Sequence, residues 1–128
     1  MKSSSVQFSL RQLVLLVLLT ALMVANPAIA QKKIYILTDL EGVSGVYKFG
    51  QTRDKDSPPN IQACEYFMDD LTVVIRGLRA GGATEILVVD AHGNQCVIPH
   101  MMEPGAKYIT GLPRPDVLSG LEESFAGM

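Results

Sequence analysis

Positive charge is scarce in this sequence, and tryptophan is absent. Lys and Arg number 11 against 13 Asp and Glu, which gives a formal net charge of −2 and a pI of about 5.6. A protein that grips a phosphate backbone needs a basic patch, usually with aromatic side chains beside it. Nucleic acid is therefore not expected as a partner.

Chain length and long hydrophobic runs are limited too. The 128 residues allow one domain at most, which excludes a repeat array, a large barrel and a multidomain enzyme. The uncharged apolar run Leu13–Val24 is shorter than the roughly 20 residues that a membrane-spanning helix needs. A transmembrane anchor of ordinary length is therefore not expected.

The same apolar run has the features of an export signal. Basic residues without any acid precede it, and a helix-breaking Asn26-Pro27 and the small-residue pattern Ala28-Ile29-Ala30 follow it. We therefore predict a signal peptide over residues 1–30 and a mature chain over residues 31–128. The protein would then be periplasmic or secreted, with no stable membrane anchor after cleavage. The alternative is an uncleaved amphiphilic anchor, against which the proline and the Ala-x-Ala spacing argue.

Two buried strands and one helix are predicted in the mature chain. Ile34–Thr38 and Glu85–Val89 are continuous apolar runs of the kind that parallel sheets bury on both faces. Asn60 is expected to cap the intervening helix, and Gly81-Gly82 to end it. Strand, helix and strand in this order predict a right-handed parallel crossover, and therefore an α/β fold. The predicted apolar face of the helix consists of Ile61, Cys64, Met68, Leu71, Ile75 and Leu78.

The remaining segments are less regular. Residues 40–60 contain three glycines and a Pro-Pro pair without a helical or strand period, which predicts a long loop of the kind that is usually functional or disordered. Farther on we expect a helical turn over Val97–Glu103, a short strand over Ala106–Thr110 and a weaker helix over Asp116–Phe125. The next strand would begin at residues 126–128. Three strands and one strong helix cannot cover both faces of a parallel sheet, so the pattern predicts an incomplete domain.

Acidic and imidazole side chains follow both predicted strands. Asp39 and Glu41 stand two residues apart after the first strand, and Gly42 lets the chain turn close to a bound group. Asp90 and His92 follow the second strand with the same spacing. Because the carboxyl ends of neighbouring parallel strands meet at one edge, Asp39, Glu41 and His92 are expected to lie within a few ångströms of one another.

This set of oxygen and nitrogen donors suits zinc, manganese or a related divalent metal. The alternative is structural, because a carboxylate after a strand is often a turn or cap residue and a single loop histidine is often a surface residue. Asp90 is the weakest candidate ligand, since its side chain could instead orient His92. His100 is expected to be a surface or packing residue.

The two cysteines leave their redox state open. Cys64 and Cys96 could pair in an oxidising compartment. Cys64 falls on the apolar face of the predicted helix, however, and a free thiol at such a position packs as a small hydrophobic group. Both alternatives are compatible with export.

Five motifs lie at or near the ends of the predicted elements. They are Asp39-Leu40-Glu41-Gly42-Val43-Ser44-Gly45, Gly82-Ala83-Thr84-Glu85-Ile86, Asp90-Ala91-His92-Gly93, Ile109-Thr110-Gly111 and Gly120-Leu121-Glu122. Together they resemble the D-aminopeptidase family of zinc metallopeptidases associated with dipeptide transport. The resemblance covers nearly all of residues 33–128, and the pattern after the first strand is its most specific part. It implies a homo-oligomer that acts on short peptides containing D-amino acids.

The resemblance implies a two-zinc site. Asp39 would bridge the ions, Glu41 would bind one of them and His92 the other. Ala91 stands where the family usually has Ser, and Thr72 where it usually has Asn, so the support around the ligands is expected to differ.

The remaining metal ligands of the family and its catalytic His correspond to positions beyond Met128. The signal peptide and the resemblance together predict an exported, metal-dependent aminopeptidase-like protein that is inactive alone. The chain is then either the amino-terminal part of a longer enzyme or a remnant that no longer catalyses. One alternative is a non-catalytic periplasmic module that binds a metal or peptide. Another makes Asp39 a phosphoryl-accepting nucleophile, but that pattern requires a second Asp where Glu41 stands.

Overall fold

The computed structural model describes residues 9–12, 31–93, 96–114 and 116–128. The expected signal peptide therefore lies outside the described residues, except for a helical turn over residues 10–12. The chain divides into two units, residues 1–30 and 31–128, and the second unit is the folded α/β part. Within the described ranges, no helix is both long enough and apolar enough to cross a membrane.

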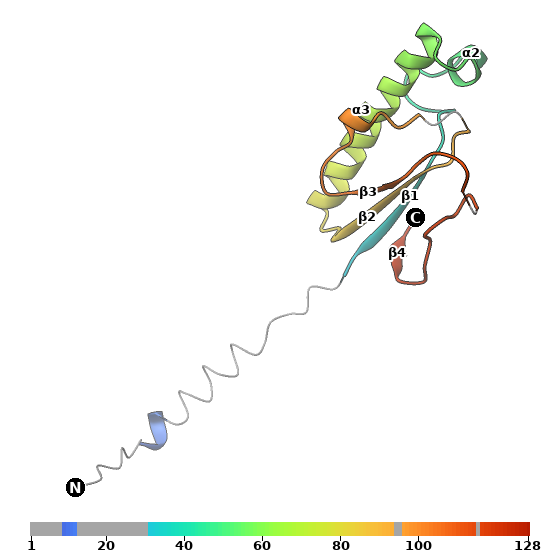
Figure 1. Cartoon of the computed structure of the whole chain (residues 1–128). Helices are drawn as coiled ribbons and strands as arrows, with labels where there is room; N and C mark the ends of the chain where they lie inside the picture. Colours follow the sequence, from blue (N-terminus) through green and yellow to red (C-terminus); the bar gives the residue numbers. More distant parts are fainter. Residues whose placement is uncertain (1–8, 13–30, 94–95, 115) are drawn as a thin grey trace, which may run out of the picture. The chain divides into compact units, whose positions relative to one another are not determined.

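A parallel sheet of four strands forms the centre of residues 31–128 (Figure 1). Its strands are β1 (Lys33–Thr38), β2 (Glu85–Asp90), β3 (Lys107–Ile109) and β4 (Phe125–Gly127), in the order β3-β2-β1-β4. β1 and β2 pair along their whole length, from Lys33 opposite Glu85 to Thr38 opposite Asp90. The predicted α/β class and the neighbouring parallel strands are confirmed.

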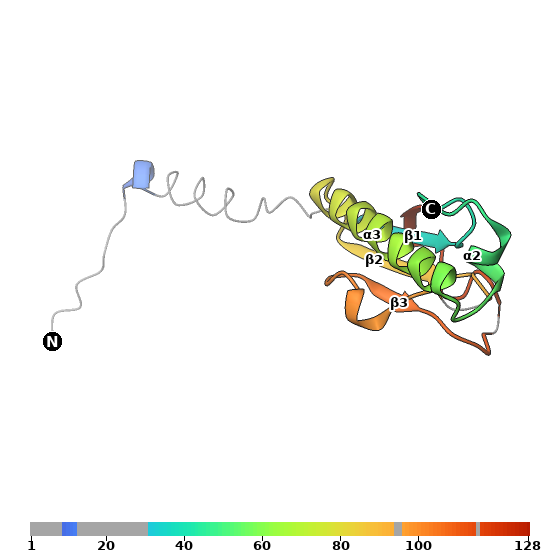
Figure 2. The same cartoon turned by 90° about the horizontal axis from the view of Figure 1, so that it is seen from above.

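The long helix α3 (Pro58–Ala80) lies along one face of the sheet (Figures 1 and 2). The prediction that Asn60 caps it is wrong, because the helix begins earlier and the Ser57 hydroxyl accepts the N–H of Asn60 at 3.3 Å. Pro58 and Pro59 fit in the first turn, where backbone N–H groups have no intrahelical partner. At the other end the predicted glycine stop is confirmed, with Gly82 at a φ of +90°.

The apolar face of α3 differs from the prediction at its first turns. Ile61 is exposed, because the preceding residue, Asn60, takes the inward position there. From this turn on, the buried face continues through Ala63 and Phe67 to the predicted positions. These side chains pack with Ile86 and Val88 of β2 and form the main core. The predicted members that are buried in it are Met68, Leu71 and Ile75.

Turns cover part of the other face of the sheet, where a second helix over Asp116–Phe125 was predicted. That prediction is wrong: the segment forms turns and then β4. The Asp116 side chain accepts the N–H of Leu118, and the Ser119 hydroxyl donates to the Asp116 carbonyl, so local bonds replace helical ones. The Tyr35 hydroxyl also donates to the Ser119 carbonyl at 3.1 Å, which ties the turn to β1.

The other predictions for this region hold. β3 forms within the predicted strand Ala106–Thr110, and a 3-10 turn at Pro99–Met101 forms within the predicted helical turn. The strand expected to begin at residues 126–128 is β4, which begins one residue earlier, at Phe125. The small core on this face contains Tyr35, Leu87 and Val89, and the Phe125 ring meets the Tyr35 ring edge-on at 5.4 Å.

Replacing Gly120 with alanine is expected to destabilise the fold by about 1–3 kcal/mol. Gly120 has a φ of +81°, and a Cβ there would lie 3.0 Å from Leu87 Cδ2 and 3.2 Å from Ile109 Cδ1. Chemical denaturation measures the effect. Gly77→Ala is the matched control, since a Cβ on this exposed helical residue meets nothing and should stabilise by about 0.5–1 kcal/mol. Equal stability of the Gly120→Ala variant and the wild type would contradict the packing described above.

Candidate metal site

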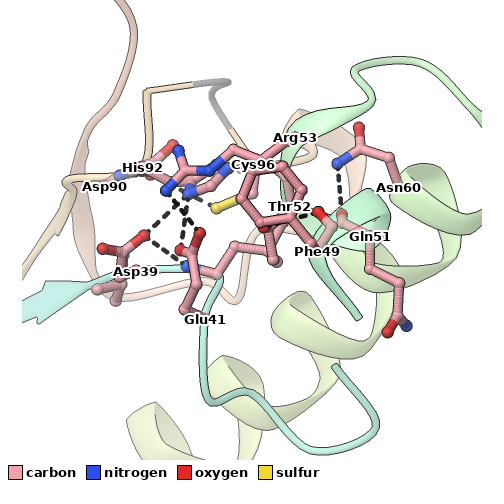
Figure 3. Close-up of polar contacts among 12 residues, drawn as sticks. Asp39, Glu41, Phe49, Gln51, Thr52, Arg53, Asn60, Asp90, His92 and Cys96 are labelled. Carbon is pink, nitrogen blue, oxygen red and sulfur yellow. Dashed lines mark hydrogen bonds and ion pairs between the residues drawn. The ribbon is translucent and has the colours of Figure 1, made fainter. Parts of the chain in front are cut away.

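The three side chains expected to converge do so at the carboxyl ends of β1 and β2. Asp39 and Glu41 follow β1, and His92 follows β2; one donor atom from each lies within 4.8 Å of the others. The shortest contacts join His92 Nδ1 to Asp39 Oδ1 at 2.8 Å and to Glu41 Oε2 at 3.3 Å (Figure 3). In the part of the chain that the structure describes, this is the one such group of metal-binding residue types.

The buried His92 ring is oriented by a backbone carbonyl. Its Nε2 lies 3.0 Å from the Thr52 carbonyl oxygen, which can only accept a hydrogen bond. Nε2 therefore carries a proton. Nδ1 faces both carboxylates and lies within hydrogen-bond distance of Asp39 Oδ1. A metal ion bound at Nδ1 would replace that hydrogen bond, with the other ring nitrogen held by a carbonyl.

The two carboxylates are more accessible than the histidine. The side chains of Asp39 and Glu41 are 59% and 42% exposed, whereas that of His92 is 1% exposed. Burial raises the pKa of Asp39, but hydrogen bonds with His92, Glu41 and the Leu40 amide outweigh this and hold the pKa below its usual value. Asp39 is thus ionised at neutral pH, and the donor group is open to solvent on its carboxylate side.

Asp90 lies outside the donor group and orients the loop that carries His92. Its buried carboxylate accepts the His92 N–H at 2.9 Å and the Thr110 hydroxyl at 3.0 Å. The Cys96 thiol also donates to it, and burial beside this carboxylate raises the pKa of the thiol. Of the two roles considered for Asp90, the structure favours the supporting one.

Residues 40–60 are more ordered than predicted, because they contain the short helix α2 (Phe49–Arg53). This helix brings two groups to the site that sequence reasoning missed: the Thr52 carbonyl, which contacts His92, and the Arg53 guanidinium, which lies 3.0 Å from Glu41 Oε1. The one sequence feature that could have predicted α2 is Gln51, because glutamine is common three positions after the residue that caps a helix start. Its side chain accepts the N–H groups of Tyr47 and Lys48.

Asn60 connects α2 to α3. Its side-chain amide donates to the Gln51 carbonyl at 2.8 Å, and its oxygen accepts the Asp56 N–H. These bonds explain why a polar residue occupies an inward position of α3. The bond to the Gln51 carbonyl also holds the end of α2 in place, and with it the neighbouring Thr52 carbonyl.

The other candidate residues are not members of the donor group. His100 is exposed on its 3-10 turn, as expected. Cys64 and Cys96 are free thiols, so of the two alternatives the structure has the unpaired cysteines and no disulfide between them. Cys96 contributes through its hydrogen bond to Asp90.

Comparison with known protein families identifies the family of this chain. The family model of the D-aminopeptidases, peptidase family M55, matches residues 32–128. The chain belongs to the D-aminopeptidase family. No curated protein and no solved structure matches the chain.

The family match confirms the resemblance seen in the sequence motifs and suggests a D-aminopeptidase-like function. It also favours a metallopeptidase over the phosphoryl-transfer alternative for Asp39. Together with the convergence of Asp39, Glu41 and His92, membership in this metallopeptidase family points to a bound metal.

Proposed function

We propose that this D-aminopeptidase family member is an exported, zinc-dependent aminopeptidase that removes N-terminal residues from short peptides containing D-amino acids. One observation carries most of the proposal: the Thr52 carbonyl leaves His92 Nδ1 as the metal-binding atom, and that atom faces both Asp39 and Glu41. A histidine held in this way against two carboxylates suits a divalent cation better than a purely structural contact.

The donor set of imidazole nitrogen and carboxylate oxygen suits several divalent ions, and zinc is proposed among them because the sequence motifs resemble a zinc metallopeptidase family. In the proposed two-ion arrangement Asp39 would be the shared ligand, Glu41 would hold one ion and His92 the other. A two-ion site requires more ligands than these three. The residues that complete it stay a prediction, as does the homo-oligomeric state of the enzyme.

The chain's own residues would prepare the site for catalysis. When bound, a divalent ion supplies Lewis-acid chemistry toward a peptide carbonyl. Thr52 holds the His92 tautomer, and Asp90 holds the loop that carries His92. Arg53 pairs with one oxygen of Glu41, which leaves the oxygen that faces His92 available to a metal. The exposed side of the two carboxylates leaves room for a peptide.

Metal removal tests the proposal. The purified protein is stripped with a chelator and titrated with Zn²⁺ in a calorimeter, and hydrolysis of D-alanine para-nitroanilide is followed before and after zinc is restored. We expect zinc binding by this chain. In a form of the protein that carries the ligands completing the two-ion site, we expect hydrolysis that the chelator abolishes and zinc restores. Zinc binding without hydrolysis in that complete form would support the non-catalytic metal-binding module instead. Absence of zinc binding would refute the metal site itself.

A further inference from the structure

A cavity of about 400 Å³ adjoins the proposed metal ligands. Glu41 and Thr52 line it, so it opens beside the carboxylate and the carbonyl that contact His92. Its volume falls within the range of about 300–1,000 Å³ that is usual for small-molecule sites. A molecule held at the metal ligands can therefore extend into this cavity.

Two cations line the cavity, and each lies against an aromatic ring. Lys48 Nζ is 5.3 Å from the centre of the Tyr47 ring, and the Arg53 guanidinium carbon is 5.9 Å from that of the Phe49 ring. Glu41 is the one acidic residue in the lining, and it is a proposed ligand. Once a metal ion takes part of the charge of Glu41, the cavity is positive and favours an anionic group.

The aromatic residues also need an explanation, because large apolar side chains are rarely left so open next to each other. Tyr47 and Phe49 are each 78% exposed. Their backbone is nevertheless held in place, since the Gln51 side chain accepts the N–H groups of Tyr47 and Lys48. Two rings on a fixed backbone beside two cations form a surface that suits an apolar side chain next to a carboxylate.

We infer that this cavity binds the C-terminal carboxylate of a short peptide substrate, with Arg53 and Lys48 as the specificity-determining residues. The inference rests on the proposed function and refines its substrate class. Arg53 lies 3.0 Å from Glu41, so its guanidinium is within reach of a peptide bound at the metal ligands. An extended chain advances by about 3.3–3.6 Å per residue, so the terminal carboxylate of a dipeptide held at the metal ligands lies close to them, as Arg53 does.

The test compares a dipeptide with its C-terminal amide. Values of kcat/KM are measured for D-Ala-D-Ala and D-Ala-D-Ala-amide with the wild type, Arg53→Gln and Lys55→Gln. We expect the wild type to prefer the free acid by about 10–100-fold, the worth of a hydrogen-bonded ion pair. Arg53→Gln should reduce this preference about tenfold or more. Lys55 is an exposed cation outside the cavity lining, and Lys55→Gln should keep the preference.

Using a ratio of two substrates separates two effects of Arg53. Because Arg53 also pairs with Glu41, its replacement is expected to slow both substrates, whereas only loss of carboxylate recognition changes their ratio. A preference that persists in Arg53→Gln, or a wild type without any preference, would overturn the inference.

Binding measurements keep this inference distinct from the proposed function. Calorimetric titration of the zinc-loaded protein with D-Ala-D-Ala and with its amide measures binding directly and does not depend on turnover. Tighter binding of the free acid by the wild type, lost in Arg53→Gln, supports the cavity even if neither peptide is hydrolysed. Equal binding of the two peptides, or binding of neither, refutes it whatever the enzyme activity.

Discussion

Replacing His92 with alanine is expected to lower zinc affinity by more than about 100-fold, because the loss of outer partners of a ligand alone costs about 10–100-fold. The imidazole supplies the nitrogen of the donor group, and its Nδ1 is the atom that both carboxylates face. Calorimetric titration of the metal-free protein with Zn²⁺ measures the loss. Activity on D-alanine substrates should fall with it.

Two further variants make this result specific. His100→Ala removes the other histidine, which is exposed and outside the donor group, and this variant should bind zinc as the wild type does. Asp39→Asn removes a ligand charge at a side chain that is 59% exposed, so a loss of zinc binding there is not explained by unfolding. Wild-type affinity in both His92→Ala and Asp39→Asn would show that these residues do not bind the metal.

Replacing Asp90 with alanine is expected to affect both metal binding and stability. The buried carboxylate accepts bonds from the His92 N–H, the Thr110 hydroxyl and the Cys96 thiol, and alanine leaves these donors without an acceptor. Unsatisfied buried groups of this kind predict a loss of about 2–4 kcal/mol in the free energy of unfolding. The displaced His92 loop predicts zinc affinity that is about 10–100-fold weaker.

Asp90→Asn is the matched control, because its side-chain oxygen can still accept the His92 N–H. This variant should keep most of the stability and metal affinity of the wild type. Denaturant unfolding with circular dichroism and zinc calorimetry give the two quantities. If Asp90→Ala bound zinc as tightly as the wild type, the loop would hold His92 without this carboxylate, and the supporting role would be wrong.

Local sequence pattern was sufficient for the parts of the fold in which side-chain type and position act together. The apolar runs at β1 and β2 and the helical spacing of Met68, Leu71 and Ile75 predicted the crossover correctly. The convergence of Asp39, Glu41 and His92 also followed, because parallel strands end at a common edge of the sheet. These features depend on short-range periodicity and on one general rule of topology.

Local pattern failed where partners distant in the chain decide the outcome. Ile61 fits an apolar stripe, but Asn60 is buried at that turn because the Gln51 carbonyl, nine residues away, needs its amide. Asp116–Phe125 has a helical pattern, but packing of Gly120 against Leu87 and Ile109, and the bond from Tyr35 to Ser119, favour turns. In both cases a tertiary contact outweighs a weak local preference.

The sequence by itself therefore determined the α/β fold class and the donor types of the site, since both depend on which side chains follow two buried strands. Only the tertiary structure decided how those donors are tuned. The contact that selects the His92 tautomer comes from the Thr52 carbonyl, a backbone group that every residue type carries, so no side-chain pattern could reveal it. Arg53 likewise reaches Glu41 only because the chain brings α2 back to the segment that follows β1.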